Sequence, residues 1–257
     1  MTFIDTHTHL YESKFDEDRN EMIQRAFDND IKKLLIPNVD ADSISGMLDI
    51  VHQFPNQIFP MMGLHPCSVQ EKSYKKELEI IHQHLFNKKE NYVAVGEIGI
   101  DLYWDKSTLE IQKEAFELQC DWAVELDLPI AIHSRDSTYV LLDILKKRTK
   151  NHKGVFHCFT GSVEEANEII KLGFYLGIGG VVTYKNTHLR DTLKQISLEH
   201  LVLETDAPYL PPVPYRGKRN ESAYIKNIAE TLCSVYEKSL DEIATITTQN
   251  AESLFNV

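Results

Sequence analysis

Residues 92–133 read YVAVGEIGIDLYWDKSTLEIQKEAFELQCDWAVELDLPIAIH, and they contain the pattern that decides the fold. The short apolar run Tyr92–Gly96 predicts a strand. The segment Thr108–Leu126 carries apolar residues at helical spacing with Glu and Lys between them, which predicts an amphipathic helix. Pro129–His133 predicts the next strand, so this stretch is one strand–helix–strand unit with parallel strands.

The same alternation extends outward to both ends of the chain. Short apolar runs predict eight strands, at Phe3–Asp5, Lys33–Pro37, Ile58–Met62, Tyr92–Gly96, Pro129–His133, Gly154–His157, Phe174–Ile178 and His200–Glu204. Longer amphipathic segments predict helices at Asp16–Asn29, Asp42–Gln53, Ser73–Phe86, Thr108–Leu126, Ser137–Lys150, Val163–Leu172, His188–Gln195, Ser222–Tyr236, Leu240–Thr248 and Ala251–Phe255.

Eight strand–helix units in one chain predict an α/β protein with a (β/α)8 TIM barrel, as a single domain over residues 1–257. A doubly wound open sheet is the alternative. No GxGxxG follows the first predicted strand, so the main sequence signal for a dinucleotide-binding sheet is missing.

Charge and composition exclude several classes of protein. The 257 residues are 42% hydrophobic and 26% charged, which is ordinary for a globular chain and excludes a disordered one. The net charge of −12 excludes a protein that coats duplex DNA, so any contact with nucleic acid must be local. The four cysteines are far apart, and we find no signal peptide and no apolar run of membrane-spanning length. We therefore expect a cytoplasmic protein with reduced thiols and no membrane association.

Histidines and carboxylates gather where the predicted strands end. In a barrel the active site lies at the C-terminal ends of the strands. His7 and His9 are two residues apart and share one face of the first strand, so they can chelate one ion together. Further candidates at the same rim are Glu97, His133, His157, Glu204 and Asp206. Imidazole and carboxylate groups suit Zn²⁺, Mn²⁺, Ni²⁺ or Fe²⁺, and Mg²⁺ where oxygen ligands dominate.

Six short motifs carry a family resemblance. In chain order they are IDTHTHL (4–10), GLHP (63–66), VGEIGID (95–101), IHSR (132–135), FHCFTGS (156–162) and LETDAPYLPP (203–212). Together they resemble the signatures of the TatD family of metal-dependent deoxyribonucleases, which belongs to the amidohydrolase-type metal-dependent hydrolases. The motifs span nearly the whole chain, and none departs from the family pattern at a metal position.

The resemblance implies a barrel with a binuclear metal centre. By it, one ion would be held by His7, His9 and Asp206, a second by His133 and His157, and Glu97 would bridge the two. We expect Mg²⁺, Mn²⁺ or Zn²⁺, with Ni²⁺ also in recombinant protein. Two metal ions together can activate a water molecule for attack on a phosphodiester, and Asp206 would act as the general base.

The resemblance also places His65, Arg135 and Glu204 on the phosphate side, with His65 as a further catalytic residue. Arg suits bidentate contact with a phosphate. On the loops after the seventh and eighth predicted strands, basic and aromatic side chains are candidates for binding a single strand, namely Lys185, Tyr209, Tyr215, Arg216, Lys218 and Arg219. A solvated basic turn with structural tyrosines is the alternative interpretation of that loop.

The sequence therefore predicts a metal-dependent hydrolase acting on ester bonds, and more narrowly a 3′→5′ exonuclease on single-stranded DNA ends, or on RNA. We expect no obligate protein partner. One alternative is a hydrolase of another ester, a lactone or an amide on the same scaffold, because the metal ligands would be identical. A second is a catalytically silent metal-binding or scaffold protein.

Overall fold

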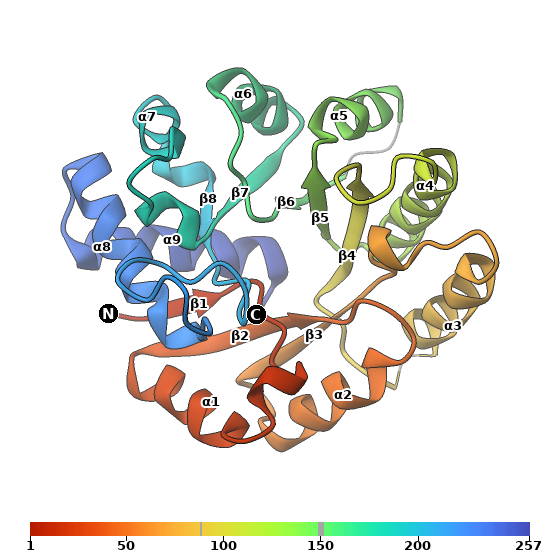
Figure 1. Ribbon diagram of the computed structural model, residues 1–257, viewed down its shortest axis with the longest axis horizontal. Helices are drawn as coiled ribbons and strands as arrows, with labels where there is room; N and C mark the ends of the chain where they lie inside the picture. The colour runs from red at the N-terminus through yellow and green to blue at the C-terminus, as the bar shows by residue number, and fades with distance from the viewer. Residues whose placement is uncertain (88, 149–151) are drawn as a thin grey trace.

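The structure is a computed structural model that describes residues 1–87, 89–148 and 152–257. In these residues eight parallel strands form one sheet in the order β1 to β8. Their bounds are β1 Phe3–Asp5, β2 Ile31–Pro37, β3 Ile58–Met62, β4 Ala94–Asp101, β5 Ile130–Arg135, β6 Gly154–Phe156, β7 Phe174–Ile178 and β8 Leu201–Leu203. The sheet curls into a nearly closed barrel, in which the backbone N–H of Thr6 donates to the carbonyl of Leu203 (3.0 Å) and joins the two ends of the sheet (Figure 1).

Helices alternate with the strands and surround the sheet (Figure 1). Their bounds are α1 Arg19–Asp28, α2 Ser43–Gln53, α3 Tyr74–Phe86, α4 Leu109–Leu126, α5 Thr138–Lys147, α6 Val163–Lys171, α7 Leu189–Leu193, α8 Ile225–Tyr236 and α9 Leu240–Phe255. Short 3-10 turns precede several of them, at Ser13–Phe15, Pro66–Ser68, Gly180–Thr183, Leu198–His200 and Ser222–Tyr224. The predicted TIM barrel is confirmed, and the open doubly wound sheet is excluded.

Period-2 alternation along the strands builds the interior of the barrel. One apolar cluster combines side chains from strands around the whole sheet with the last turns of α9, and it contains Ile4, Leu35, Met61, Ala94, Ala131, Val155, Val202, Ala251, Leu254 and Phe255. The other faces of the strands pack against the helices in a second, larger cluster. Because successive strand residues point to opposite faces, the side chain two positions beyond each interior residue also points inward, closer to the C-terminal end of the barrel.

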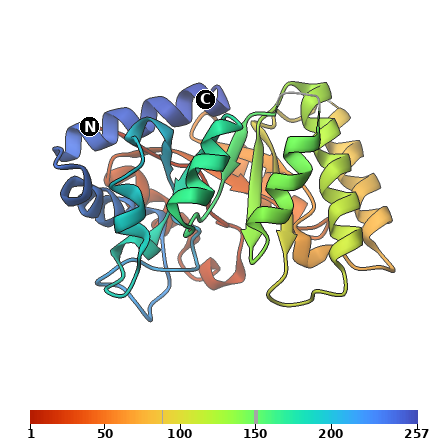
Figure 2. The ribbon, with the colours of Figure 1, turned by 90° about the horizontal axis from the view of Figure 1, so that it is seen from above.

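The two ends of the barrel differ in what covers them. Figure 2 shows α9 and both chain termini across one end, and the loops that follow β4 and β8 projecting from the other. Helix α9 contacts β1 and β8, and its Asn250 amide donates to the carbonyls of Leu198 and Leu201 just before and at the start of β8. Only the C-terminal end of the strands is therefore left open to form a site.

Most predicted boundaries shift by one to three residues in the structure, and larger differences occur in β4, α5 and α9. Strand β4 continues to Asp101, because Ile98 to Asp101 pair with β5 beyond the predicted end at Gly96. The predicted helices Leu240–Thr248 and Ala251–Phe255 are one continuous helix, α9. The predicted helix Ser137–Lys150 ends at Lys147 in the structure, and positions 149 and 150 lie outside the described residues.

Candidate metal centre

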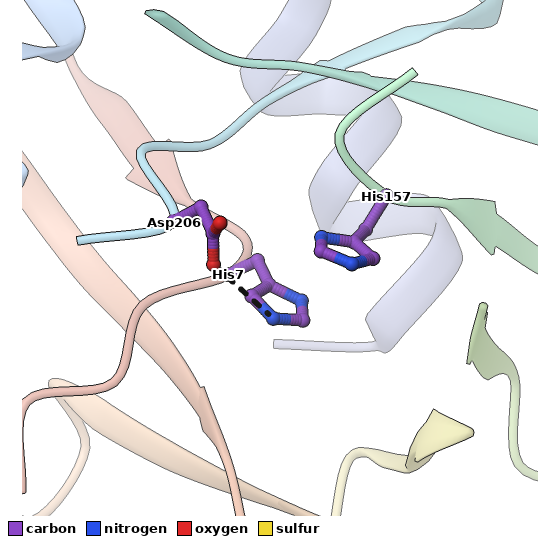
Figure 3. Close-up of side chains that lie close together, drawn as sticks. All are labelled: His7, His157 and Asp206. Atoms are coloured by element: carbon purple, nitrogen blue, oxygen red, sulfur yellow. Dashed lines mark ion pairs between the residues drawn. The ribbon is translucent and has the colours of Figure 1, made fainter. Parts of the chain in front are cut away.

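His7, His9 and Asp206 lie together although Asp206 follows the last strand. Nε2 of His7 is 3.3 Å from Nε2 of His9. Oδ1 of Asp206 is 3.4 Å from Nε2 of His9 and 4.0 Å from Nε2 of His7. The bridge between Thr8 and Ala207 holds the two segments side by side, and Figure 3 shows the Asp206 carboxylate directed at the His7 ring. These atoms form one ligand group.

Glu97 is the central carboxylate of the site, and its side chain is 2% exposed. It lies in β4 at an irregularity in the register with β5, between Gly96 and Ile98. Its Oε2 is 3.2 Å from Nε2 of His7 and 3.6 Å from Nε2 of His9. Its Oε1 faces a different set of imidazoles, so the two oxygens of one carboxylate contact two separate groups of side chains.

The second group consists of His65, His133 and His157. Oε1 of Glu97 is 2.7 Å from Nε2 of His157, 2.8 Å from Nδ1 of His133 and 3.3 Å from Nε2 of His65. His133 and His157 follow the interior residues Ala131 and Val155 by two positions, which is why both point inward. The rings of His7 and His157 stack at 4.0 Å between centroids, so the two groups are adjacent (Figure 3).

The donor atoms of these side chains fit a bound cation. His7, His9 and Glu97 offer ligand atoms within 4.8 Å of one another, as do His65, Glu97 and His133, and His7, His157 and Asp206. Buried nitrogen and oxygen lone pairs face one another at 2.7–3.6 Å, which is unfavourable unless protons or cations lie between them. Mixed imidazole and carboxylate donors suit Zn²⁺, Mn²⁺ and related ions. The site is therefore built to bind metal.

Electrostatics keep the two carboxylates ionised despite burial. Burial raises the pKa of Glu97, but the positive charges that His157, His65 and His7 can carry outweigh it and hold the pKa well below its ordinary value. Burial likewise opposes ionisation of Asp206, and the hydrogen bond with His9 lowers the pKa of that carboxyl. Both groups are thus ready to bind a cation at neutral pH.

Several buried groups hold the candidate ligands in place. Oδ2 of Asp101 is 3.0 Å from Nε2 of His133, and this contact keeps the pKa of Asp101 at about 2 although burial opposes it. The Tyr11 hydroxyl is 3.0 Å from Nδ1 of His9. Such outer hydrogen bonds fix the tautomer and orientation of a ligating imidazole.

Two further carboxylates lie beneath the site. Glu204 is fully buried; its Oε1 accepts a hydrogen bond from the Cys158 N–H (2.5 Å) and is 3.5 Å from Nδ1 of His157. Asp5 accepts hydrogen bonds from the Thr205 N–H (2.9 Å) and hydroxyl (2.6 Å), and burial raises its pKa to about 7. Through these contacts the end of β1 and the segment after β6 are each joined to the segment after β8.

Comparison with known proteins identifies the family. The model of the family described as TatD related DNase matches residues 4–256. This chain belongs to that family. The metal-dependent hydrolase YabD of Bacillus subtilis is 39% identical over 98% of both chains, and YjjV of Escherichia coli is 34% identical over 99% of this chain and 98% of its own. The chain is a TatD-type metal-dependent hydrolase that acts on ester bonds.

Solved structures agree with this assignment. The crystal structure of YjjV, a TatD homologue from Escherichia coli, superposes with a TM-score of 0.92 at 33% identity and covers 99% of this chain and 98% of its own. A TatD-family hydrolase from Entamoeba histolytica has a TM-score of 0.85 at 25% identity, and the match covers 99% of this chain and 98% of its own.

Among the described residues of this TatD-type hydrolase, no helix is both long and apolar enough to cross a bilayer.

The structure brings together all six residues predicted as metal ligands, which are His7, His9, Glu97, His133, His157 and Asp206. It also places His65 among them, with its Nε2 3.3 Å from both Oε1 of Glu97 and Nδ1 of His133. Arg135 lies on the rim, two residues beyond His133 and exposed. Glu204 lies deeper than predicted, because its complete burial behind His157 directs it to that ring rather than to substrate.

The loop after β8 agrees only partly with the prediction. Tyr209 is 40% exposed and lies edge-on to His9, with 6.1 Å between ring centroids. The Arg216 guanidinium packs over the Tyr184 ring, 4.2 Å from its centroid. Two further candidates have partners within the protein: Arg219 pairs with Asp18 (2.6 Å), and the Tyr215 ring stacks on Tyr224 with 3.8 Å between centroids. Contact of these two side chains with substrate stays a prediction.

Three residues near the site escaped the sequence analysis: Asp101, Tyr103 and Trp104. Asp101 lies in the quoted motif VGEIGID, four residues beyond Glu97. The sequence offers a signal for it, because the second hydrogen-bond partner of a metal-binding histidine is a carboxylate, a backbone carbonyl or a water. It was hidden because the predicted strand stopped at Gly96, which left Asp101 in a loop.

Proposed function

We propose that this TatD-type hydrolase cleaves phosphodiester bonds in nucleic acid and removes nucleotides from the 3′ ends of single-stranded DNA, with RNA as a further substrate. The observation that carries the proposal is that the two carboxylate oxygens of Glu97 contact different imidazoles. Its two oxygens face two adjacent ligand groups, an arrangement suited to a pair of divalent cations. The description of the family as a DNase supports the choice of nucleic acid, and the 3′→5′ direction follows from the family resemblance.

The two ligand groups would hold one ion each. His7, His9 and Asp206 would hold the first, His133 and His157 the second, and Glu97 would contact both. His65 reaches the same oxygen of Glu97 as the second group. A pair of divalent cations, Mg²⁺, Mn²⁺ or Zn²⁺, supplies an activated water and neutralises charge on a phosphodiester.

Asp206 is the residue we assign as general base. Its side chain is 14% exposed, compared with 2% for Glu97, so water reaches this carboxylate more readily. The hydrogen bond with His9 keeps it ionised, and an ionised carboxylate at the mouth can accept a proton from the attacking water.

Phosphate recognition falls to His65 and Arg135 in this proposal. His65 is 14% exposed and lies beside the second ligand group, and Arg135 presents an exposed guanidinium beyond His133. An imidazole N–H and a guanidinium can both donate to phosphate oxygens. The positive charge of Arg135 offsets the overall charge of −12 where substrate binds.

The decisive experiment is a digestion panel with metal titration. Single-stranded DNA, duplex DNA and RNA of one sequence, labelled at the 5′ or the 3′ end, are incubated with Mg²⁺, Mn²⁺ or Zn²⁺. We expect a ladder of shortening products from the 5′-labelled single strand, immediate release of labelled mononucleotide from the 3′-labelled one, and slower cleavage of duplex. The Asp206→Asn variant is the negative control. Intact oligonucleotides alongside hydrolysis of lactones or carboxylic esters would overturn the proposal.

The number of ions has a separate test. Elemental analysis of the metal-loaded protein should give about two ions per chain if each oxygen of Glu97 serves its own ligand group. Glu97→Ala removes the shared ligand and should lower this ratio. An unchanged ratio in the variant would contradict the bridging role.

We also propose the cytoplasm as the compartment in which the protein works, with no obligate protein partner. The four cysteines Cys67, Cys120, Cys158 and Cys233 are free thiols, which suits a reducing environment. Cell fractionation and sedimentation of the purified protein test these two points. Recovery from a membrane fraction, or only in a complex with another chain, would contradict them.

A further inference from the structure

The loop between β4 and α4 exposes two aromatic side chains in succession. Tyr103 is 55% exposed and Trp104 is 71% exposed, and their rings meet edge to face with 4.9 Å between centroids. Trp104 is the most exposed of the large hydrophobic residues in the part of the chain that the structure describes. Single apolar side chains on a surface are common, but an adjacent aromatic pair beside an active site indicates binding.

Arg135 fixes one side of this pair. Its guanidinium carbon lies 3.8 Å from the centroid of the Tyr103 ring and 5.5 Å from that of Trp104. A cation over an aromatic ring is attracted by the negative face of the ring. Arg135 therefore covers the Tyr103 ring while Trp104 stays open to solvent.

The pair is tied directly to the candidate metal centre. Oδ1 of Asp101 accepts hydrogen bonds from the backbone N–H groups of Tyr103 (2.9 Å) and Trp104 (3.3 Å). Oδ2 of the same carboxylate is 3.0 Å from Nε2 of His133. One buried side chain thus holds a ligand histidine on one side and the backbone of the aromatic loop on the other, which ties the start of this loop to the candidate metal centre.

We propose that Trp104, held by Tyr103 and Arg135, is a stacking platform for a base of the single-stranded substrate; this proposal rests on the proposed nuclease function. The loop after β4 projects from the open end of the barrel (Figure 2), so a strand whose phosphate lies at the ligands would pass beside it. Every base has a π-face, so stacking binds a strand without regard to sequence.

Charge favours a base and its phosphate as the occupant. The platform combines an open indole face with a guanidinium, which suits a flat ring joined to an anion. The chain carries a net charge of −12, so general attraction to a polyanion is absent and a local stacking contact has more to contribute.

The test compares an oligonucleotide with one of equal length in which tetrahydrofuran residues replace the bases. In the wild-type protein the ratio of kcat/KM for the base-containing strand to that for the abasic strand should be high. Trp104→Ala should lower this ratio about 10-fold, and Trp104→Phe should restore most of it. Leu118→Ala is the control, because Leu118 is a 40% exposed apolar side chain on α4; it should leave the ratio unchanged.

Fluorescence gives an independent readout. The chain has two tryptophans, and Trp122 is 7% exposed, so in a Trp122→Phe background the emission comes from Trp104 alone. Oligothymidylate should quench this emission, whereas the abasic strand should not. Quenching that is equal for both strands would overturn the platform.

The outcomes separate the two proposals. Cleavage of oligonucleotides with an unchanged ratio in Trp104→Ala overturns the platform and leaves the nuclease function standing. A wild-type protein that cleaves no oligonucleotide overturns the nuclease function, and the fluorescence titration then decides the platform. A change of oligomeric state in Trp104→Ala without a change of ratio would assign this surface to contact between copies of the chain, which also overturns the proposal.

Discussion

The same strands build both ends of the barrel, but the residues at the two ends differ in polarity and in what covers them. At the N-terminal end, Ala131 and Val155 belong to an apolar layer that α9 covers. Two residues further along the same strands, His133 and His157 point into a polar cluster at the open end. Residues at one end of each strand therefore stabilise the fold, and residues at the other end form the candidate metal centre. Substitutions at the two ends should affect different quantities, which can be measured separately.

Asp206→Asn should give the largest effect of these substitutions. It should lower activity, which depends on the open end of the barrel, and leave the stability of the fold nearly unchanged. Removing the general base and a candidate ligand should lower kcat/KM on a single-stranded oligonucleotide by about 100- to 10,000-fold. The melting temperature of the metal-free protein should change by a few degrees at most, because the amide is nearly isosteric. Asp191→Asn, an exposed carboxylate on α7, is the matched control. Retained activity would refute the assigned role.

Phe255→Ala should lower the stability of the fold by disturbing the apolar layer at the N-terminal end of the barrel. Phe255 is 2% exposed in the layer beneath the barrel, so truncation leaves a cavity and should lower the free energy of unfolding by about 3–5 kcal/mol. Activity per folded molecule at 25 °C should stay near wild type. Urea denaturation and initial rates measure the two quantities. Leu118→Ala, at a 40% exposed position on α4, should cost much less. A large loss of kcat in Phe255→Ala would show that the ends are coupled.

Asp101→Asn should have an intermediate effect at the open end. Its carboxylate orients His133, so the amide should weaken metal binding about 10- to 100-fold. Titration with a competing chelator measures this affinity. Asp105→Asn is the matched control, because Asp105 lies in the loop that follows β4 and its carboxylate contacts Ser107 instead; it should leave the affinity unchanged. Equal metal affinities for the two variants would show that Asp101 does not contribute to metal binding through His133.

Asp18→Asn should give the smallest effect and a characteristic pH dependence. Asp18 accepts hydrogen bonds from Arg25 and Arg219, which join the loop after β8 to α1 and hold the pKa of Asp18 well below its usual range. A carboxyl with a lowered folded-state pKa stabilises the fold above its unfolded pKa, near 4, and loses this contribution as the pH falls.

The expected loss of stability in Asp18→Asn at pH 7 is less than about 1 kcal/mol, because the pair is partly exposed. The difference between wild type and variant, measured by urea denaturation, should shrink from pH 5 to pH 3. A difference that is constant over this range would mean that the ion pairs contribute nothing through the charge of Asp18.

Local pattern was sufficient for the fold and for the choice of candidate ligands. The strand ends with His7, His9 and His133 could be located because period-2 and period-3.6 patterns are carried by neighbouring residues. Strand β4 was predicted too short, since Gly99 and the polar Asp101 interrupt its apolar run while its backbone continues to pair with β5. The pairing partner, rather than local composition, sets where that strand ends.

The loops illustrate the opposite case. Arg219 and Tyr215 have the composition of a binding loop, but the first is neutralised by Asp18 and the second is stacked on Tyr224. Asp18 is 201 residues from Arg219 in the chain, and no periodicity in sequence predicts such a pair. No sequence pattern indicates a role for the exposed Trp104 either. The structure relates it to the site, because Asp101 contacts both His133 and the backbone N–H of Trp104.

By itself the sequence determined the alternation of strands and helices, the residue types at the strand ends and hence a barrel with imidazoles and carboxylates at one rim. Tertiary structure alone decided that Oε1 and Oε2 of Glu97 face different imidazoles and that Asp101 joins His133 to the aromatic loop. The reason is that His7 and Glu97 are 90 residues apart. Their distance depends on how strands twist, pair and close into a barrel, which adjacent residues do not encode.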